Sequence, residues 1–289
     1  MKKVVILTGK SGDLCNRLFR FARFYCAKPR GVLLLDITFY QFAYLFSPKS
    51  FLWKSFFLLL RLLDNKRFAG LVRILQSLPG IQKADPTRLG SETSNRTLSR
   101  FYEYVLEATS RVILVEENTF YLVADHENEE AAAALKKIFN LKKKYTKECA
   151  RLFQQCDTTR ITVGVHLRRR DYRTFAGGRY FFDNQQYRGF LSQLQSANPY
   201  PGKLEFLLVC EEPLEIADFR PLEVKCFGPS SIGVDQALLS ACNFIVGPPS
   251  TFSGWAAFLH RIPRAEIQSR NQSISWADFK ETSCNYISI

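Results

Sequence analysis

Three consecutive arginines follow an apolar run near the middle of the chain, in the segment His166-Leu-Arg-Arg-Arg-Asp171-Tyr172. A guanidinium offers a planar fork of donors that fits phosphate oxygens, and it stays charged at neutral pH. Because side chains alternate along a strand, we expect His166 and Arg168 to project to the same side. We therefore predict an anion site at His166, Arg168 and Arg169. The alternatives are a solvated charged loop and, for His166, a core histidine.

A second candidate site follows the apolar run Asn243–Val246, in the segment Gly247-Pro-Pro-Ser250-Thr251-Phe252-Ser253. Ser250 or Thr251 is suited to cap the helix that follows, and the N-terminus of a helix favours anions. A cap needs no ligand, so capping alone is the alternative. Because both segments lie in the same half of the chain, one shared phosphate site is the stronger interpretation.

A third segment, Gly9-Lys-Ser-Gly12-Asp-Leu-Cys-Asn16-Arg17, superficially resembles a phosphate loop. A Walker A motif requires GxxxxGK[ST], and this segment does not have that spacing. A tight turn is enough to explain its two glycines.

The composition indicates a globular protein with an anionic partner. The chain has 289 residues, 46% of them hydrophobic, and a formal net charge of +13. Nucleotide pyrophosphate, nucleic acid and acidic lipid all satisfy that charge. Eight scattered cysteines without a CxxC pair, together with only three histidines, predict buried thiols and no metal site.

The N-terminal half opens with a strand, a turn, a helix and a second strand, which form a βαβ unit of a parallel sheet. The region from 50 to 156 is expected to be mainly helical. The segments that carry these predictions are strands Lys3–Leu7, Val32–Leu35 and Arg111–Val115, and helices Glu127–Phe139 and Lys142–Gln155.

Strands and helices alternate again in the C-terminal half, which predicts a second α/β domain. The polar residues 157–160 are expected to link the two, so we place domains at 1–157 and 158–289. Tandem α/β domains bind ligands in the cleft between them, at the carboxyl ends of strands. The expected elements are strands Ile161–Val165, Leu204–Cys210, Glu223–Phe227 and Asn243–Val246, and helices Asn184–Gln195, Val234–Ala241 and Thr251–Leu259.

The segment Phe51–Leu63 is rich in large apolar residues but contains Lys54 and Arg61. It is shorter than the roughly 20 residues of a membrane span. We predict a core helix; the alternative is a basic amphipathic helix on a membrane surface, formed by residues 50–75. The N-terminus carries only about five apolar residues before Thr8, fewer than a secretory signal needs. We therefore expect a cytoplasmic protein, with peripheral contact to the inner face of a membrane under the alternative.

Taken together and in order, three segments resemble the GDP-fucose-dependent fucosyltransferases, in particular the α-1,2-fucosyltransferase family. That family has a glycine turn leading into GNQ[ML]FQ[YF]A, a central HxRRGDY, and a late DxxL[ML][ST]xC before an SSFSWW-like turn. The matching segments here are Gly12–Ala22, with Arg17 at the glutamine position, His166–Tyr172, with Arg170 at the glycine position, Asp235–Cys242 and Ser250–Trp255.

The resemblance implies a GT-B architecture, with two Rossmann-like domains facing a central cleft. It implies an inverting transfer of fucose from GDP-fucose, without a metal or other cofactor, to a glycan or lipid-linked saccharide in cell-surface polysaccharide biosynthesis. The N-terminal domain would bind the acceptor, and the C-terminal domain the donor. The implied donor contacts are Arg168 on the β-phosphate, His166 lining the pocket, Asp235 on guanine, Ser250, Thr251 and Phe252 on phosphate or nucleoside, and Asn16 on the pyrophosphate.

An inverting transfer also needs a base that accepts a proton from the acceptor hydroxyl. Asp171, Asp183 and Asp13 are the candidates, and the sequence does not choose among them. A transferase for another nucleotide sugar and a non-catalytic relative that binds only the donor remain alternatives. A basic nucleic-acid-binding protein is a further alternative, but the chain has no RNP or helix-turn-helix pattern, so nucleic acid is not the expected partner.

Overall fold

The computed structural model describes residues 3–10, 12–85, 98–116, 122–124, 129–157 and 159–287. These residues form two compact units. The N-terminal unit comprises Met1–Asn140 together with Ser283–Ile287, and the C-terminal unit comprises Leu141–Thr282. Several predicted positions lie outside the described residues: Ser11 of the first turn, residues 127 and 128 of a predicted helix, and residue 158 at the predicted domain start.

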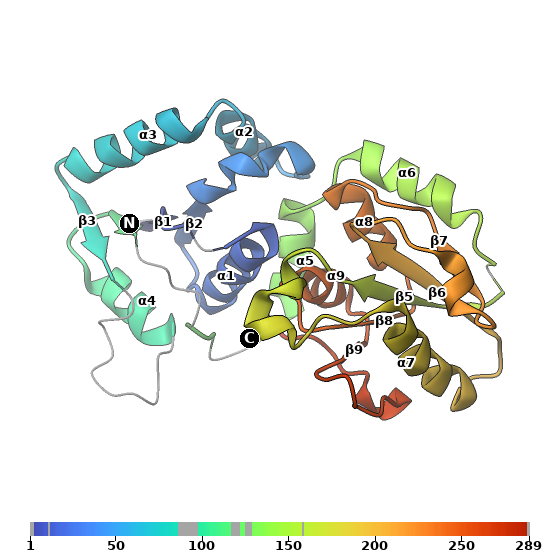
Figure 1. Ribbon diagram of the computed structural model, residues 1–289. Helices are drawn as coiled ribbons and strands as arrows, with labels where there is room; N and C mark the ends of the chain where they lie inside the picture. Colours follow the sequence, from blue (N-terminus) through green and yellow to red (C-terminus); the bar gives the residue numbers. More distant parts are fainter. Residues whose placement is uncertain are drawn as a thin grey trace. The chain divides into compact units, whose positions relative to one another are not determined.

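The N-terminal unit is built on a parallel sheet with the strand order β2-β1-β4-β3 (Figure 1). The two inner strands, β1 and β4, are apolar runs, which suits a position buried between two neighbours. The strands are β1 (Lys3–Leu7), β2 (Val32–Asp36), β3 (Ile81–Ala84) and β4 (Val112–Val115). The helices are α1 (Leu14–Ala27), η1 (Ile37–Gln41), η2 (Ala43–Leu45), α2 (Phe51–Leu60), α3 (Asn65–Ser77), α4 (Leu98–Glu107) and α5 (Glu129–Ile138).

An aromatic cluster fills the space between α1, η1 and α2. The ring of Phe139 lies 5.3 Å from Phe21, 5.0 Å from Phe39 and 6.0 Å from Phe57, measured between centroids. Phe57 and Leu60 of α2 are buried in this core, whereas other apolar residues of the same helix are exposed. The predicted core helix is therefore confirmed for only one face of α2. No helix in the described ranges is both long and apolar enough to cross a membrane.

A buried ion pair fixes the turn after β1. Arg20 Nη2 lies 2.7 Å from Asp36 Oδ2, and both side chains are almost fully buried. Thr38 donates to the same carboxylate through its amide and hydroxyl groups, and Arg20 also donates to the Gly9 carbonyl. Arg17 donates to the carbonyls of Gly12 and Thr38. The turn is thus held to α1 and to the end of β2, and Arg17 has a structural role in it.

The C-terminal unit contains a parallel sheet with the strand order β7-β6-β5-β8-β9. Its strands are β5 (Ile161–Leu167), β6 (Leu204–Cys210), β7 (Val224–Cys226), β8 (Phe244–Gly247) and β9 (Arg264–Glu266). Its helices are α6 (Lys143–Phe153), η3 (Asp171–Arg173), η4 (Phe175–Gly178), α7 (Asn184–Ser196), η5 (Ile216–Phe219), α8 (Ile232–Leu239), α9 (Thr251–His260) and η6 (Trp276–Asp278).

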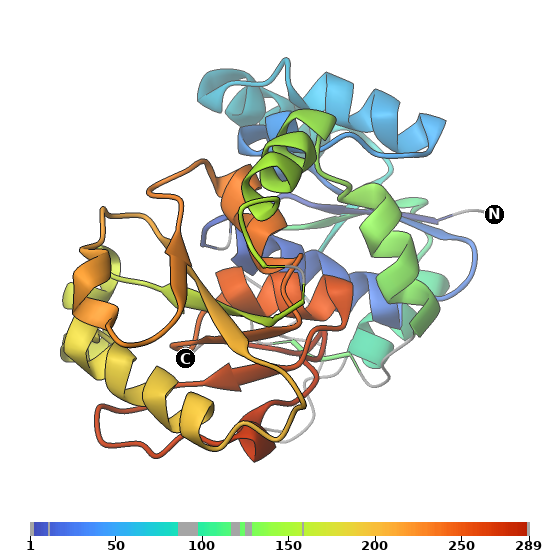
Figure 2. The same ribbon diagram turned by 90° about the vertical axis from the view of Figure 1, so that its right-hand side faces the viewer.

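Helices cover both faces of this sheet (Figures 1 and 2). Val163 and Val165 join the apolar core formed with α7. Gly164, between them, faces the other side of the sheet. A Cβ added there would lie 2.9 Å from Cys242 Sγ and 3.2 Å from Leu239 at the end of α8, so the helix packs closely on the strand. The predicted α/β class with two Rossmann-like domains is confirmed, and the predicted strands agree with the structure to within two residues.

Three features differ from the sequence prediction. Helix α6 lies in the C-terminal unit because Tyr145 packs against Gly233 of α8, so the units divide near residue 140 and not at 157. Residues 283–287 return to the N-terminal unit, where Asn285 exchanges hydrogen bonds with Ala124 and Tyr286 packs on Phe19. Strands β3 and β9 were not predicted. Both are short edge strands with few apolar residues.

Replacing Arg20 with methionine should strongly destabilise the N-terminal unit. The change strands the buried Asp36 carboxylate without its counter-charge, so we expect the free energy of unfolding to fall by about 3–5 kcal/mol. Urea denaturation measures the effect. Arg67→Met is the matched control, because its ion pair with Asp64 is exposed and should contribute less than about 1 kcal/mol. Equal losses in the two variants would contradict the assigned role of Arg20.

Candidate functional site

The carboxyl ends of the five parallel strands bring the predicted segments of the C-terminal unit to one edge of the sheet. Val165 of β5 pairs with Val246 of β8, so His166 lies beside Gly247. An added Cβ at Gly247 would lie 2.6 Å from the His166 carbonyl oxygen, so this close approach requires glycine. The loops after β5 and β8 therefore begin side by side.

His166 is buried under the first turn of α9. Its side chain is 2% exposed, and its ring centroid lies 5.3 Å from that of Phe252. Burial lowers the pKa of His166 well below its usual value, and the positive charges of Arg168 and Arg264 lower it further. The imidazole is therefore neutral. Among the described residues its Nδ1 has no hydrogen-bond partner, which leaves a buried polar atom available to a ligand.

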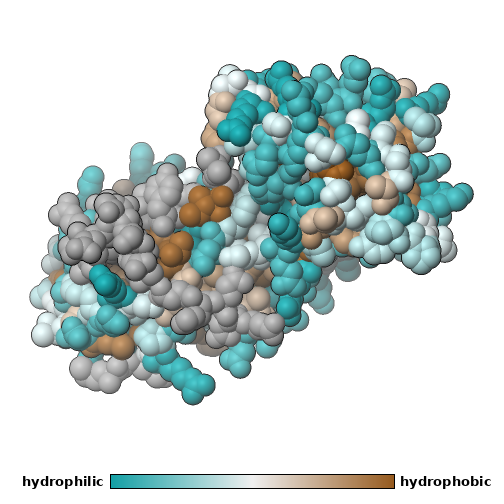
Figure 3. All heavy atoms as spheres, turned by 90° about the horizontal axis from the view of Figure 1, so that it is seen from below, coloured by the Kyte–Doolittle hydropathy of each residue, from teal (hydrophilic) through white to brown (hydrophobic). Residues whose placement is uncertain are grey.

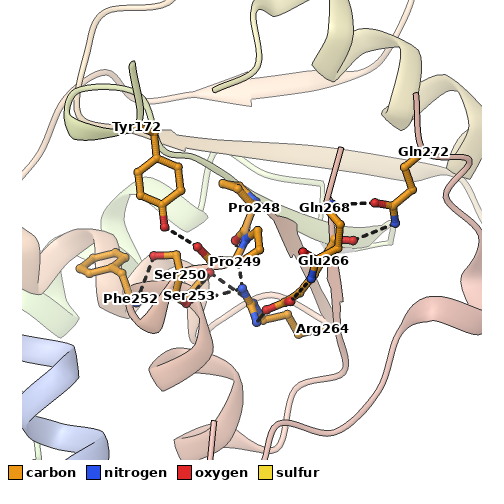
Figure 4. Close-up of polar contacts among 10 residues, drawn as sticks. All are labelled: Tyr172, Pro248, Pro249, Ser250, Phe252, Ser253, Arg264, Glu266, Gln268 and Gln272. Carbon is orange, nitrogen blue, oxygen red and sulfur yellow. Dashed lines mark hydrogen bonds and ion pairs between the residues drawn. The ribbon is translucent and has the colours of Figure 1, made fainter. Parts of the chain in front are cut away.

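Arg168 and Asp171 form a two-point ion pair at the end of β5. Arg168 Nε lies 2.9 Å from Asp171 Oδ1, and Nη2 lies 3.1 Å from Oδ2. The guanidinium also lies over the ring of Tyr172, 5.8 Å from its centroid. Tyr172 donates its hydroxyl proton to the Pro249 carbonyl (Figure 4), and burial raises its pKa to about 12, so it remains a donor at neutral pH. Tyr172 thus joins the loop after β5 to the turn before α9.

The other two arginines of the run have different surroundings. Arg169 is buried, and its guanidinium donates to the side-chain oxygen of Asn184 at the start of α7. Arg170 is exposed and donates to the Glu211 carbonyl at 3.1 Å. The backbone amides of both arginines donate to Glu211 Oε1 at 3.3 Å. Of the three guanidiniums, the structure places that of Arg168 beside Tyr172 and close to His166.

A buried arginine from β9 shapes the turn that starts α9 (Figure 4). Arg264 donates to the carbonyls of Pro248 and Ser250, at 3.0 and 3.5 Å, and to Ser253 Oγ at 3.2 Å. Ser250 caps α9 by accepting the Phe252 amide proton at 3.2 Å, as its sequence position predicts. Thr251 is the first residue of the helix and is half-buried.

Arg264 is itself held by a chain of polar contacts that runs along the edge of the sheet. Its guanidinium pairs with Glu266 at 2.5 Å, and the other oxygen of Glu266 accepts from Gln268 at 2.6 Å. Gln272 donates to the Glu266 carbonyl and accepts from the Gln268 amide, as Figure 4 shows. The position of the α9 turn therefore depends on Glu266, Gln268 and Gln272.

Asp235 lies in the first turn of α8 and is partly buried. Burial raises the pKa of its carboxyl to about 6, the hydroxyl of Ser230 opposes that rise by hydrogen bonding, and the charge of Glu211 adds to it. The next residue, Gln236, donates to the Phe252 carbonyl at 2.7 Å. The start of α8 is thereby linked to the same α9 turn as His166.

The other two predicted site residues, Asp183 and Asn16, have contacts of their own. Asp183 caps α7: its carboxylate accepts the Gln186 amide proton at 2.8 Å, and the Gln186 side chain accepts from the Asp183 amide. Asn16 belongs to the N-terminal unit, where its side chain packs against Gly12. Gly12 has a φ of +54°, and a Cβ there would overlap Asn16.

The sequence analysis missed Arg264, Glu266 and Glu211. Arg264 and Glu266 lie on an edge strand that has no apolar run, and Glu211 follows β6 at the same sheet edge as the arginines. Glu211 could have been found from the sequence, because the acidic pair Glu211-Glu212 directly follows a strongly apolar strand. In the described part of the chain, no group of three His, Cys, Asp or Glu residues is arranged to hold a metal ion.

Searches with the sequence found no matching family model and no matching curated protein. Solved structures do match. Fucosyltransferase NodZ from Bradyrhizobium has a TM-score of 0.53 at 15% identity over 92% of this chain and 96% of its own. A mutant of Arabidopsis thaliana FUT1 in complex with GDP has a TM-score of 0.54 at 12% identity over 93% of this chain and 72% of its own. The chain shares its fold with these GT-B-like glycosyltransferases.

The raised pKa of Asp235 makes a prediction about stability and pH. The protonated form of Asp235 favours the folded state. Its contribution to the free energy of unfolding is therefore full below about pH 4 and is lost as pH rises through about 6. Asp235→Asn removes that loss. We expect the variant to be more stable than the parent by on the order of 2 kcal/mol at pH 8, and equal to it near pH 4.

Urea denaturation across this pH range tests the prediction. Glu215→Gln is the control, because Glu215 is exposed and its side chain forms no cap bond. A difference for Asp235→Asn that does not change with pH would contradict the prediction.

Proposed function

We propose that the protein transfers fucose from GDP-fucose to a hydroxyl group of a glycan or a lipid-linked saccharide. The main support is that His166, Arg168 and the capped start of α9 lie together at one edge of the sheet. The fold that brings them together is shared with fucosyltransferase NodZ. The NodZ structures include one soaked with GDP-fucose, and the matching FUT1 structure holds GDP. These ligands support the choice of donor.

In this proposal the C-terminal unit stabilises the departing GDP. The bond between fucose C1 and the β-phosphate oxygen breaks, and negative charge develops on the phosphate. The acceptor oxygen bonds to C1 from the opposite side and loses its proton to a base. Arg168 and the positive end of α9 are suited to stabilise that charge. Asp171 orients Arg168 through their two-point ion pair, and His166 offers a neutral polar contact to the donor.

The guanine base is proposed to bind Asp235, whose carboxylate accepts hydrogen bonds when it is ionised. The roles of Ser250, Thr251, Phe252 and Asn16 in donor binding rest on the family resemblance and remain predictions. So does the α-1,2 linkage: NodZ is an alpha-1,6-fucosyltransferase with the same fold, so the fold does not select a linkage. NMR of the product would identify the linkage.

Isothermal titration with GDP, UDP and ADP tests the choice of donor. We expect GDP to bind at least about tenfold more tightly than either of the others, since a site with placed hydrogen-bond groups rejects bases that leave them unpaired. Equal binding of all three nucleotides would reject the fucosyl assignment, and tighter binding of UDP or ADP would favour another nucleotide sugar. GDP binding without any release of GDP from GDP-fucose, when acceptors are offered, would indicate a non-catalytic relative.

Arg168→Ala should reduce kcat/KM for GDP-fucose by about 100-fold or more, the usual loss when a donor to developing charge is removed. Arg270→Ala is the matched control, because Arg270 is an exposed arginine of the same unit that lies outside the group around His166. We expect it to keep activity within about twofold of the parent. Similar losses in both variants would show that net charge, and not the position of Arg168, supports the reaction.

The candidate bases Asp171 and Asp183 can be separated by amide substitution. Asparagine caps a helix as well as aspartate does, so Asp183→Asn should keep both α7 and turnover within about twofold. Asp171→Asn weakens the ion pair with Arg168 and should lower turnover at least about tenfold. A loss of about 100-fold in Asp183→Asn, with unchanged thermal unfolding, would identify Asp183 as the base.

A further inference from the structure

Helix α2 has apolar side chains on two opposite faces. Its inner face carries Phe57 and Leu60, which are 1% and 2% exposed. Phe57 already packs against Phe46 and Phe139, so the core fully explains this face. A helix at the surface of a globular protein normally places polar residues on the opposite face.

The outer face of α2 instead carries large hydrocarbon side chains. Phe51 and Leu58 are seven residues apart, as are Leu52 and Leu59, so the four share one face of the helix. Phe51 is 85% exposed, and the other three are between 53% and 63% exposed. Leu62 follows directly after the helix and is also exposed. Contiguous apolar surface of this kind marks an interaction site.

This outer surface is unusual within the protein. Of the thirteen large apolar side chains exposed in the described residues, seven lie between residues 51 and 78. By contrast, the coloured surface on the right of Figure 3 is mostly hydrophilic, and its hydrophobic side chains lie in small separate groups. Helices α2 and α3 follow one another along the same side of the N-terminal unit (Figure 1).

Positive charge surrounds these apolar side chains. Residues 47–79 contain six lysines and arginines and one aspartate, a net charge of +5. Lys54 is exposed on α2, and Lys66 and Arg73 are exposed on α3, seven residues apart and so on one face. The one aspartate, Asp64, is occupied by capping α3 and by its contact with Arg67.

We propose that the outer surface of α2 and α3 binds an anionic lipid bilayer. Apolar side chains can enter the boundary between headgroups and acyl chains, while lysine and arginine remain with the phosphates. The charge selects this occupant: a second copy of the chain would bring two surfaces of +5 together, whereas an anionic membrane neutralises both charge and exposed hydrocarbon. The same protein would thereby be held where a lipid-linked acceptor is found.

Vesicle co-sedimentation tests this proposal with the full chain. We expect binding to phosphatidylglycerol-containing vesicles to exceed binding to pure phosphatidylcholine vesicles by about tenfold or more, and to weaken as salt rises. The variant Phe51→Ser/Leu58→Ser should lose about tenfold or more of this binding. Its matched control is Leu106→Ser/Ile232→Ser, which removes exposed apolar side chains elsewhere.

Charge reversal tests the lysines separately. Lys54→Glu/Lys66→Glu should reduce binding to anionic vesicles about tenfold or more and leave the weak binding to phosphatidylcholine unchanged. Lys147→Glu/Lys203→Glu makes the same change in net charge at exposed lysines of the C-terminal unit, and should have little effect. Equal losses in the two pairs would overturn the assignment to α2 and α3.

Two readouts keep the outcome clear. Urea denaturation of each variant should match that of the parent, which shows that the chain is folded by a measurement that does not depend on the donor assignment. Sedimentation velocity without vesicles should give the same mass for the parent and for Phe51→Ser/Leu58→Ser. A parent dimer that this variant dissociates, together with no vesicle binding, would assign the surface to a second copy and overturn the proposal.

Discussion

A buried guanidinium needs hydrogen-bond acceptors and a counter-charge, and this constraint shapes a strand-to-helix turn in both units. In the N-terminal unit Arg20 bonds to the Gly9 carbonyl and pairs with Asp36. In the C-terminal unit Arg264 bonds to the Pro248 and Ser250 carbonyls and pairs with Glu266. In each unit the arginine binds carbonyl oxygens of the turn, and an acidic side chain balances its charge. Removing the acidic partner of such a buried arginine would cost several kcal/mol.

The same constraint gives the C-terminal unit its electrostatic character. Arg264 is neutralised beneath the turn, whereas Arg168 lies nearer the surface and is held in place by Asp171. Burial lowers the pKa of His166 and both charges lower it further, so the neutral imidazole adds a polar contact without adding charge. An anion at this edge would therefore meet a charge fixed by the loop after β5 and a helix end fixed by β9, with little rearrangement of either.

The sequence predicted the features that depend on local pattern, namely the buried strands and the helix starts. Apolar runs such as Leu204–Cys210 identified the buried strands, and Ser250 identified the start of α9. The edge strands β3 and β9 were not predicted, because these partly exposed strands have no such apolar run. The role of Arg264 in the α9 turn was not predicted, because it depends on the pairing of β8 with β9. That pairing brings together residues more than ten positions apart. Arg168 and Arg169 were predicted to form one anion site, but their guanidiniums have different partners, Asp171 and Asn184.

The return of residues 283–287 to the N-terminal unit has a consequence for the order of events during synthesis. The ribosome makes residues 141–282 after most of the N-terminal unit but before the segment that completes it. Until then Ala124 lacks Asn285, and Phe19 lacks the ring of Tyr286. The C-terminal unit, whose residues are contiguous, can close first. A fragment that ends near residue 140 would therefore lack part of the core of the N-terminal unit.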